Sequence, residues 1–189
     1  NGDVIDGTGA ARQSADIGIR GDRVATIGDL SKASADVEHD VANRVVAPGF
    51  IDVHTHDDHA LLSKPDMSYK TSQGVTTVVA GNCGISLAPL RFVGDRPPPP
   101  LDLLGDGYKF PRMSEFFSAI DANPAATNAA LLCGHTTLRV GAMDELQRPA
   151  TDTEIDAMCD NLAEALDAGA VGLSTGLAYE PAKPAPTSE

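Results

Sequence analysis

The first 46 residues alternate between short apolar stretches and turn-forming residues. The predicted strands span 15–20, 24–27, 37–41 and 44–46. In the first of these, Ile17 and Ile19 lie on one face, and the two-residue turn Gly21-Asp22 separates it from the second, a pattern that predicts a β-hairpin. We therefore expect residues 1–46 to form a small, incomplete, β-sandwich-like all-β subdomain with exposed strand edges.

From residue 47 the pattern changes to strand, loop and helix in repetition. The predicted strands span 50–53, 75–80, 127–133 and 170–174, and helical patterns occur within 59–72, at 114–122 and from 151 to 168. Four strands that alternate with helices or loops predict a parallel α/β array, either an open doubly wound sheet or a (β/α)₈ barrel. No Gly-x-Gly-x-x-Gly follows any strand, which weighs against a dinucleotide-binding fold. A TIM-like barrel needs about 250 residues, so residues 47–189 (189 − 46 = 143) correspond to its first half, about four βα units.

The clearest helix begins with a capping box formed by Thr151 and Glu154. Its apolar stripe consists of Ile155, Met158, Cys159, Leu162, Ala163 and Leu166. Because Cys133 and Cys159 both lie in apolar patterns, we expect both thiols to be buried in packing.

Four consecutive prolines, 97–100, lie at the centre of a long loop that spans 91–109. This run favours a stiff, extended polyproline II segment. The segment is interpreted as an extended loop over the rim of a site, with a ligand for a partner domain as the alternative.

Composition excludes several classes of partner. The chain has 189 residues, is 42% hydrophobic and carries a formal net charge of −13, which argues against nucleic acid or an anionic membrane surface as a partner. No apolar run approaches the roughly 18 residues of a membrane span, and no signal-peptide pattern is present. Three widely spread cysteines do not make a disulfide framework. We therefore expect a soluble, cytoplasmic protein.

Both ends of the chain resemble cuts within a longer sequence. The chain opens without methionine inside a strand-turn pattern, and residues 187–189 are typical of a helix N-terminus with no helix after it. A fragment of a longer protein is therefore expected.

Candidate chemistry gathers where the predicted strands end. His54 and His56, at positions i and i+2 after an apolar strand, share one face, so both rings can reach one ion. Cys83 follows the next strand in a tight Gly81–Gly84 turn. Nitrogen and sulfur donors on adjacent strand ends suit zinc. The alternative is an exposed His-Thr-His at a strand edge.

Three segments carry a resemblance to a known family: GFIDVHTHDD at 49–58, GVTTVVAGNCG at 74–84 and GLSTGLAY at 172–179. The chain resembles the amidohydrolase superfamily, and the Gly-Asn-Cys-Gly turn points to its N-acyl-D-amino-acid deacylase (D-aminoacylase) branch. The resemblance implies that His54, His56 and Cys83 bind one or two zinc ions, and that the substrate is a small N-acyl-D-amino acid whose amide bond is hydrolysed.

The same resemblance implies that two further histidine ligands and a catalytic aspartate come from later strands, which these 189 residues do not include. We therefore expect the fragment alone to be inactive until the C-terminal segment completes the barrel. The alternatives are another amidohydrolase, such as a dihydroorotase-like or hydantoinase-like cyclic amidase, and a non-catalytic truncated chain.

Two further residues are candidates near this site. His135 follows the third strand and either orients a ligand or the substrate or is a hydrogen-bonded structural histidine. Tyr179 either donates a hydrogen bond to the substrate or packs at the rim. Glu180 is interpreted as a solvated loop charge. Asp57 and Asp58 lie too far along to bind the same ion and are expected to bond to His56 or to neighbouring backbone.

Overall fold

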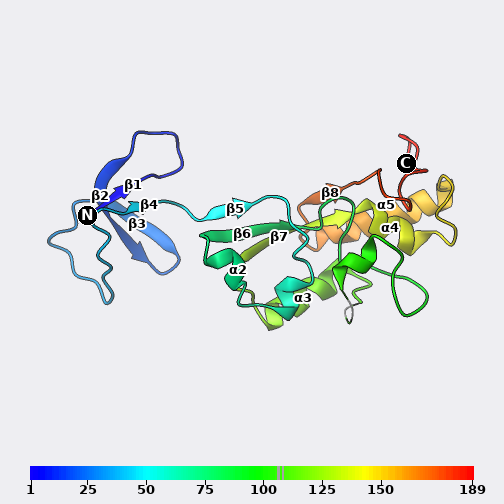
Figure 1. The fold of residues 1–189 in the computed structure, drawn as a ribbon, viewed down its shortest axis with the longest axis horizontal. Helices are drawn as coiled ribbons and strands as arrows, with labels where there is room; N and C mark the ends of the chain where they lie inside the picture. Colours follow the sequence, from blue (N-terminus) through cyan, green and yellow to red (C-terminus); the bar gives the residue numbers. More distant parts are fainter. Residues whose placement is uncertain (106, 108) are drawn as a thin grey trace. The chain divides into compact units, whose positions relative to one another are not determined.

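The computed structural model describes residues 1–105, 107 and 109–189, and the chain divides into two units, Asn1–Gly49 and Phe50–Glu189. The strands of the first unit are drawn in blue shades in Figure 1, and those of the second run from cyan to orange. The predicted boundary, with a β-sandwich-like subdomain at 1–46 and the first half of a hydrolase barrel at 47–189, stays a prediction.

The first unit contains one four-stranded sheet with the order β3-β2-β1-β4. Its strands are β1 (Gly2–Val4), β2 (Gln13–Arg20), β3 (Arg23–Gly28) and β4 (Val45–Val46). The predicted hairpin is confirmed, because β2 and β3 are antiparallel and Ile19 lies opposite Val24. β1 runs antiparallel to β2 and parallel to β4, which completes an all-β unit.

The strand predicted at 37–41 is wrong, since the structure has no strand there. Asp40 accepts a hydrogen bond from the backbone N–H of Ala42 at 3.0 Å, and Asp29 does the same for Ser31 at 2.9 Å. Such local bonds give the backbone an alternative to sheet pairing and favour turns.

The second unit is built on a parallel sheet with the order β5-β6-β7-β8. Its strands are β5 (Phe50–Asp52), β6 (Val75–Ala80), β7 (Asn128–Gly134) and β8 (Gly172–Ser174). Strands that are consecutive in sequence are neighbours throughout this sheet, with no reversal of order. This is the winding of a (β/α)₈ barrel and not of a doubly wound sheet. Figure 1 shows the four strands side by side, with helices in the connections between them. The α/β half-barrel predicted from the sequence is therefore confirmed.

The connections contain α1 (Ala60–Ser63), α2 (Ser68–Thr71), the 3₁₀ helix η1 (Leu101–Leu104), α3 (Met113–Ala122), α4 (His135–Ala142) and α5 (Asp152–Asp167). The capping box at Thr151 is confirmed, because its hydroxyl accepts from the N–H of Glu154 and the Glu154 carboxylate accepts from the N–H of Thr151. Among the described residues, no helix has the length and apolar character that crossing a membrane requires.

Two expectations about the helices are corrected. Cys133 is buried, but Cys159 is exposed, because α5 turns Met158 and Ala165 toward the core and leaves the thiol one step away on the solvent side. Helix α4 was not predicted, since its first turn contains β-branched threonines. Tertiary bonds favour it there: the Thr137 hydroxyl donates to the Ser86 carbonyl at 2.9 Å and accepts from the Ser86 N–H.

The extended proline segment is also corrected. Pro100 has φ −90° and ψ 6° and leads directly into η1, whereas polyproline II requires ψ near about +145°. Leu101 and Leu104 are buried, so burial of these side chains favours the turn. The same predicted loop, 91–109, includes Asp106 and Tyr108, which lie outside the described residues.

The core of the second unit lies between its sheet and its helices. It includes Leu61, Val78, Leu87, Phe116 and Leu131, each at most 2% exposed. Large apolar side chains of the two outer strands are exposed: Phe50 on β5 at 65% and Leu173 on β8 at 50%.

Candidate metal centre

The two histidines of the His-x-His motif lie just beyond β5. Thr55 between them is buried, and both its N–H and its hydroxyl donate to the Val79 carbonyl of β6 at 3.1 Å. This anchor holds Thr55 inside, whereas the side chains of His54 and His56 on either side of it are exposed. Their ring centroids lie 5.9 Å apart with planes at 69°.

Cys83 lies in the turn Gly81–Gly84 that follows β6. Its φ is 58°, in the left-handed region that non-glycine residues seldom adopt. The turn packs against backbone: a Cβ on Gly81 would lie 2.2 Å from the Leu132 carbonyl oxygen, and one on Gly134 would lie 2.5 Å from the Gly84 carbonyl oxygen. Glycines at these positions let the turn approach β7 closely.

The two segments bring three donor atoms together. One ligand atom each from His54, His56 and Cys83 lies within 4.8 Å of the others, and His54 Nε2 is 3.0 Å from Cys83 Sγ. In the part of the chain that the structure describes, this is the one such group of three. Zinc bonds nitrogen at about 2.0–2.1 Å and sulfur at about 2.3 Å, so small side-chain adjustments would let one ion reach all three donors. The donor set therefore fits zinc.

The electrostatics of His56 suit ligation. Partial loss of hydration around its ring, and then the neighbouring charge of His54, lower the pKa of His56. A lower pKa favours the neutral imidazole, whose lone pair is the form that binds a metal.

A lysine contacts acidic side chains on both sides of the His-x-His segment. Lys70 on α2 contacts Asp52 Oδ2 at 2.7 Å and Asp57 Oδ2 at 3.1 Å, one carboxylate before the histidines and one after them. Burial opposes the charge of Lys70, but the two carboxylates outweigh it and raise its pKa. Tyr69 donates to Asp57 Oδ1 at 3.0 Å, and burial together with this contact raises the pKa of Tyr69 to about 12. Both ends of the segment are thereby tied to α2.

Asp58 ties the cysteine turn to the same segment. Its carboxylate is 1% exposed and accepts from the N–H of Gly81 and the N–H of Leu87, both at 3.1 Å. Burial raises the pKa of Asp58 to about 6. The carboxylate bonds to backbone, but these partners are not the neighbours in the sequence that were expected: they lie 23 and 29 residues away.

The other two candidates lie outside the group of three donors. His135 begins α4, and its two ring nitrogens contact Glu189 Oε1 at 3.2 Å and Thr175 Oγ1 at 3.3 Å. Tyr179 packs against the core. Glu180 is exposed beside Lys183, as predicted. Whether His135 and Tyr179 contact a ligand stays a prediction.

A buried ion pair behind His135 was missed by sequence reasoning. Arg139 and Glu189 are in contact, and both side chains are 0% exposed. Arg139 Nε also donates to the Pro181 carbonyl at 2.7 Å, and Glu189 Oε2 accepts from the Ala150 N–H at 3.1 Å. The sequence pattern did not indicate a buried arginine, because Glu189 and the Pro181 carbonyl, which bond to Arg139, lie far away along the chain.

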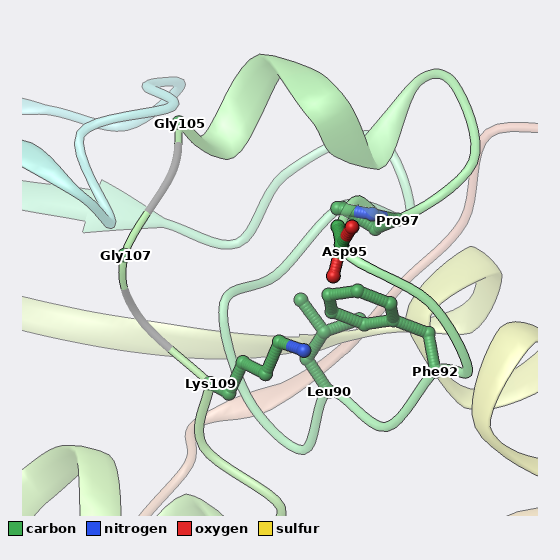
Figure 2. Close-up of a pocket in the computed structure, with 7 residues that line it drawn as sticks. All are labelled: Leu90, Phe92, Asp95, Pro97, Gly105, Gly107 and Lys109. Atoms are coloured by element: carbon green, nitrogen blue, oxygen red, sulfur yellow. The ribbon is translucent and has the colours of Figure 1, made fainter.

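A separate hollow lies in the loop before α3 (Figure 2). It has a volume of about 450 Å³, and its lining includes Leu90, Phe92, Asp95 and Lys109. The Lys109 ammonium lies 4.3 Å from the centroid of the Phe92 ring. None of the three metal-donor residues lines this hollow.

Comparisons with known proteins show which sequence family the chain resembles. The sequence model described as the amidohydrolase family matches residues 38–189. The chain is 56% identical to D-aminoacylase from Alcaligenes xylosoxydans xylosoxydans, over 100% of this chain and 39% of that protein. It is 52% identical to the N-acyl-D-glutamate deacylase of the same organism, over 94% of this chain and 36% of that protein.

The solved structures that resemble the chain are of the same kinds of deacylase. The crystal structure of a D-aminoacylase superposes with a TM-score of 0.95 at 55% identity, covering 99% of this chain and 40% of the other. The N-acyl-D-glutamate deacylase from Bordetella bronchiseptica, complexed with zinc and a phosphonate inhibitor, superposes with a TM-score of 0.95 at 49% identity, covering 99% and 39%. The chain thus spans about two fifths of the length of these relatives.

Proposed function

The chain belongs to the amidohydrolase family, and from this membership we propose that it supplies the first half of the barrel of a zinc-dependent deacylase that hydrolyses the amide bond of N-acyl-D-amino acids. The relatives that support this substrate class are named D-aminoacylase and N-acyl-D-glutamate deacylase. The single observation that carries the proposal is the convergence of His54, His56 and Cys83 within 4.8 Å.

In this proposal the three residues hold zinc, with either one or two ions in the complete site. A bound zinc ion would act as a Lewis acid on the amide carbonyl and activate water. The chain's own part is to orient the donors: Thr55 and Lys70 fix the two histidines, and Asp58 fixes the cysteine turn. His135 and Tyr179 are proposed to lie near the substrate or to orient groups that do.

We further propose that later βα units complete the barrel and supply two histidine ligands and the aspartate that acts as general base. The coverage of about two fifths of the relatives supports this, as do the exposed apolar side chains of β5 and β8.

A cytoplasmic location is also proposed, because Cys83, Cys133 and Cys159 are all free thiols, as in reducing compartments. Cell fractionation tests this location, and recovery of the protein from the medium or the periplasm would contradict the proposal.

The test uses the full protein that carries this chain. Zinc content, cobalt substitution and hydrolysis of N-acyl-D- and N-acyl-L-amino acids are compared in wild type, Cys83→Ala and Cys159→Ala. The second variant is a matched control, because Cys159 is an exposed thiol on α5 away from the three donors.

We expect Cys83→Ala to lose most of its zinc and the thiolate-to-cobalt absorption band, while Cys159→Ala keeps both. Hydrolysis should favour the D-substrates. Unchanged zinc content in Cys83→Ala would remove the cysteine from the site. Activity on cyclic amides in place of N-acyl-D-amino acids would favour a hydantoinase-like enzyme, and no hydrolysis of either would favour a non-catalytic chain.

A further inference from the structure

The hydroxyl of Ser174, at the end of β8, spans the turn that contains Cys83. Ser174 Oγ donates to the Gly81 carbonyl at 2.5 Å and accepts from the Gly84 N–H at 3.0 Å. These contacts join residues 93 and 90 positions apart in the sequence. A single hydroxyl therefore fixes both ends of the turn.

The conformation of the turn needs such support. Gly81, Cys83 and Gly84 have φ values of 82°, 58° and 77°, and a non-glycine residue such as Cys83 keeps this conformation only where its surroundings hold it there. Each of the four backbone groups at the two ends of the turn has a hydrogen-bond partner. Asp58 accepts from Gly81 N–H and the Thr137 N–H donates to the Gly84 carbonyl, while Ser174 serves the remaining two groups.

We propose that Ser174 is a positioning residue for the metal centre: its hydroxyl holds the Cys83 turn so that the sulfur faces His54 and His56. The inference rests on the proposed zinc site and adds β8 to the elements that build it. Ser174 is not itself a ligand. It acts by restricting the directions that the Cys83 side chain can take, and so it sets the affinity of the centre and the geometry of the sulfur–metal bond.

Removing a side chain that orients a metal ligand typically lowers metal affinity by about 10–100-fold. A purely structural tether would instead lower stability and leave the metal bond unchanged. The two roles therefore separate on a spectroscopic readout, because the thiolate-to-cobalt band depends on the distance and direction of the sulfur.

The experiment measures zinc affinity by competition, the cobalt band and urea unfolding in the full protein. Four variants are compared: Ser174→Ala, Ser174→Val, Ser174→Thr and Ser86→Ala. Thr and Val are nearly equal in size and differ in the hydroxyl, so that pair isolates the hydrogen bonds even if the alanine variant folds poorly. Ser86 is the matched control: its buried hydroxyl also donates to a carbonyl, of Ala88 at 2.6 Å, and accepts from an N–H, of Gly134 at 2.9 Å, without bonding the turn.

We expect Ser174→Ala and Ser174→Val to bind zinc about 10–100-fold more weakly with an altered band, and Ser174→Thr and Ser86→Ala to stay close to wild type in both. Wild-type affinity and an unaltered band in Ser174→Val, with lowered stability, would overturn the proposal and leave a structural tether. A wild-type protein without a cysteine-dependent band would refute the proposed zinc site itself, and the positioning role with it.

Discussion

Gly176, two residues after β8, lies against the backbone of the cysteine turn, and replacing it with alanine should disturb that turn. A Cβ at this position would lie 2.2 Å from the Cys83 carbonyl oxygen and 2.9 Å from Cε2 of Tyr179. The φ of Gly176 is not positive, so alanine fits the local backbone and the effect is steric. The aromatic ring can rotate away, whereas the carbonyl belongs to the packed turn.

The size of the clash sets the expected cost. Ordinary van der Waals contact begins at 3.4 Å, so the oxygen must recede by about 3.4 − 2.2 = 1.2 Å. Forcing an extra methyl group into a packed site costs about 1–3 kcal/mol in the free energy of unfolding. Because the moving carbonyl belongs to Cys83 itself, the sulfur shifts with it, and zinc affinity should fall by about 10-fold or more, each 10-fold being about 1.4 kcal/mol.

The assay combines urea unfolding of the metal-free protein with zinc titration, for Gly176→Ala and Gly172→Ala. Gly172 lies on β8, and its Cβ would meet the nearest atom, Leu132 Cδ2, at 3.5 Å, an ordinary contact. We expect only Gly176→Ala to lose stability and affinity. Equal behaviour of the two variants would refute the reasoning, since the close approach of the backbone at Cys83 would then carry no cost.

Three further predictions concern the helices. Thr151→Ala removes the N-cap of α5 and should lower the unfolding free energy by about 1 kcal/mol in urea titration. The Arg148 guanidinium, by hydrogen bonds, lowers the pKa of Glu154 to about 2, so the stability that this carboxylate contributes is complete above its ordinary pKa of 4.5 and is lost as the pH falls toward 2. The free energy of unfolding, measured across that pH range, should therefore fall less steeply as the pH is lowered in Glu154→Gln than in wild type. Equal slopes in the two proteins would contradict the ion pair. Arg139→Met leaves the Glu189 carboxylate buried without its cation and should cost about 3–5 kcal/mol, partly recovered in the double variant with Glu189→Leu; an unchanged single variant would count against the pair.

Local patterns in the sequence were sufficient for several features that depend on neighbours along the chain, although local bonds such as that from Ala42 to Asp40 replaced the strand predicted at 37–41. The hairpin around Gly21-Asp22, the β-branched strand at 75–80 and the capping box at Thr151 were all predicted, because turn geometry, strand alternation and cap bonds involve residues a few positions apart. His54 and His56 also belong to this class, since their shared face follows from an i, i+2 spacing.

Other predictions failed where packing in the folded protein decided the outcome. Cys159 lies in an apolar stripe, yet the rotation of α5 against the core leaves it in solvent. Helix α4 has a threonine-rich start, yet Thr137 is held by Ser86, 51 residues away. Pro100 turns away from an extended path beside two buried leucines.

The candidate site shows the same division. The sequence by itself determined the donor types and their place at strand ends, because residue identity fixes which atoms can bind a metal and strand patterning fixes where each side chain emerges. Only the tertiary structure decided that the sulfur of Cys83 meets the ring of His54, 29 residues away, at 3.0 Å. That distance depends on a left-handed turn held by Asp58 from before the turn and Ser174 from well after it, and bonds between such distant parts of the chain form only once the parallel strands have packed.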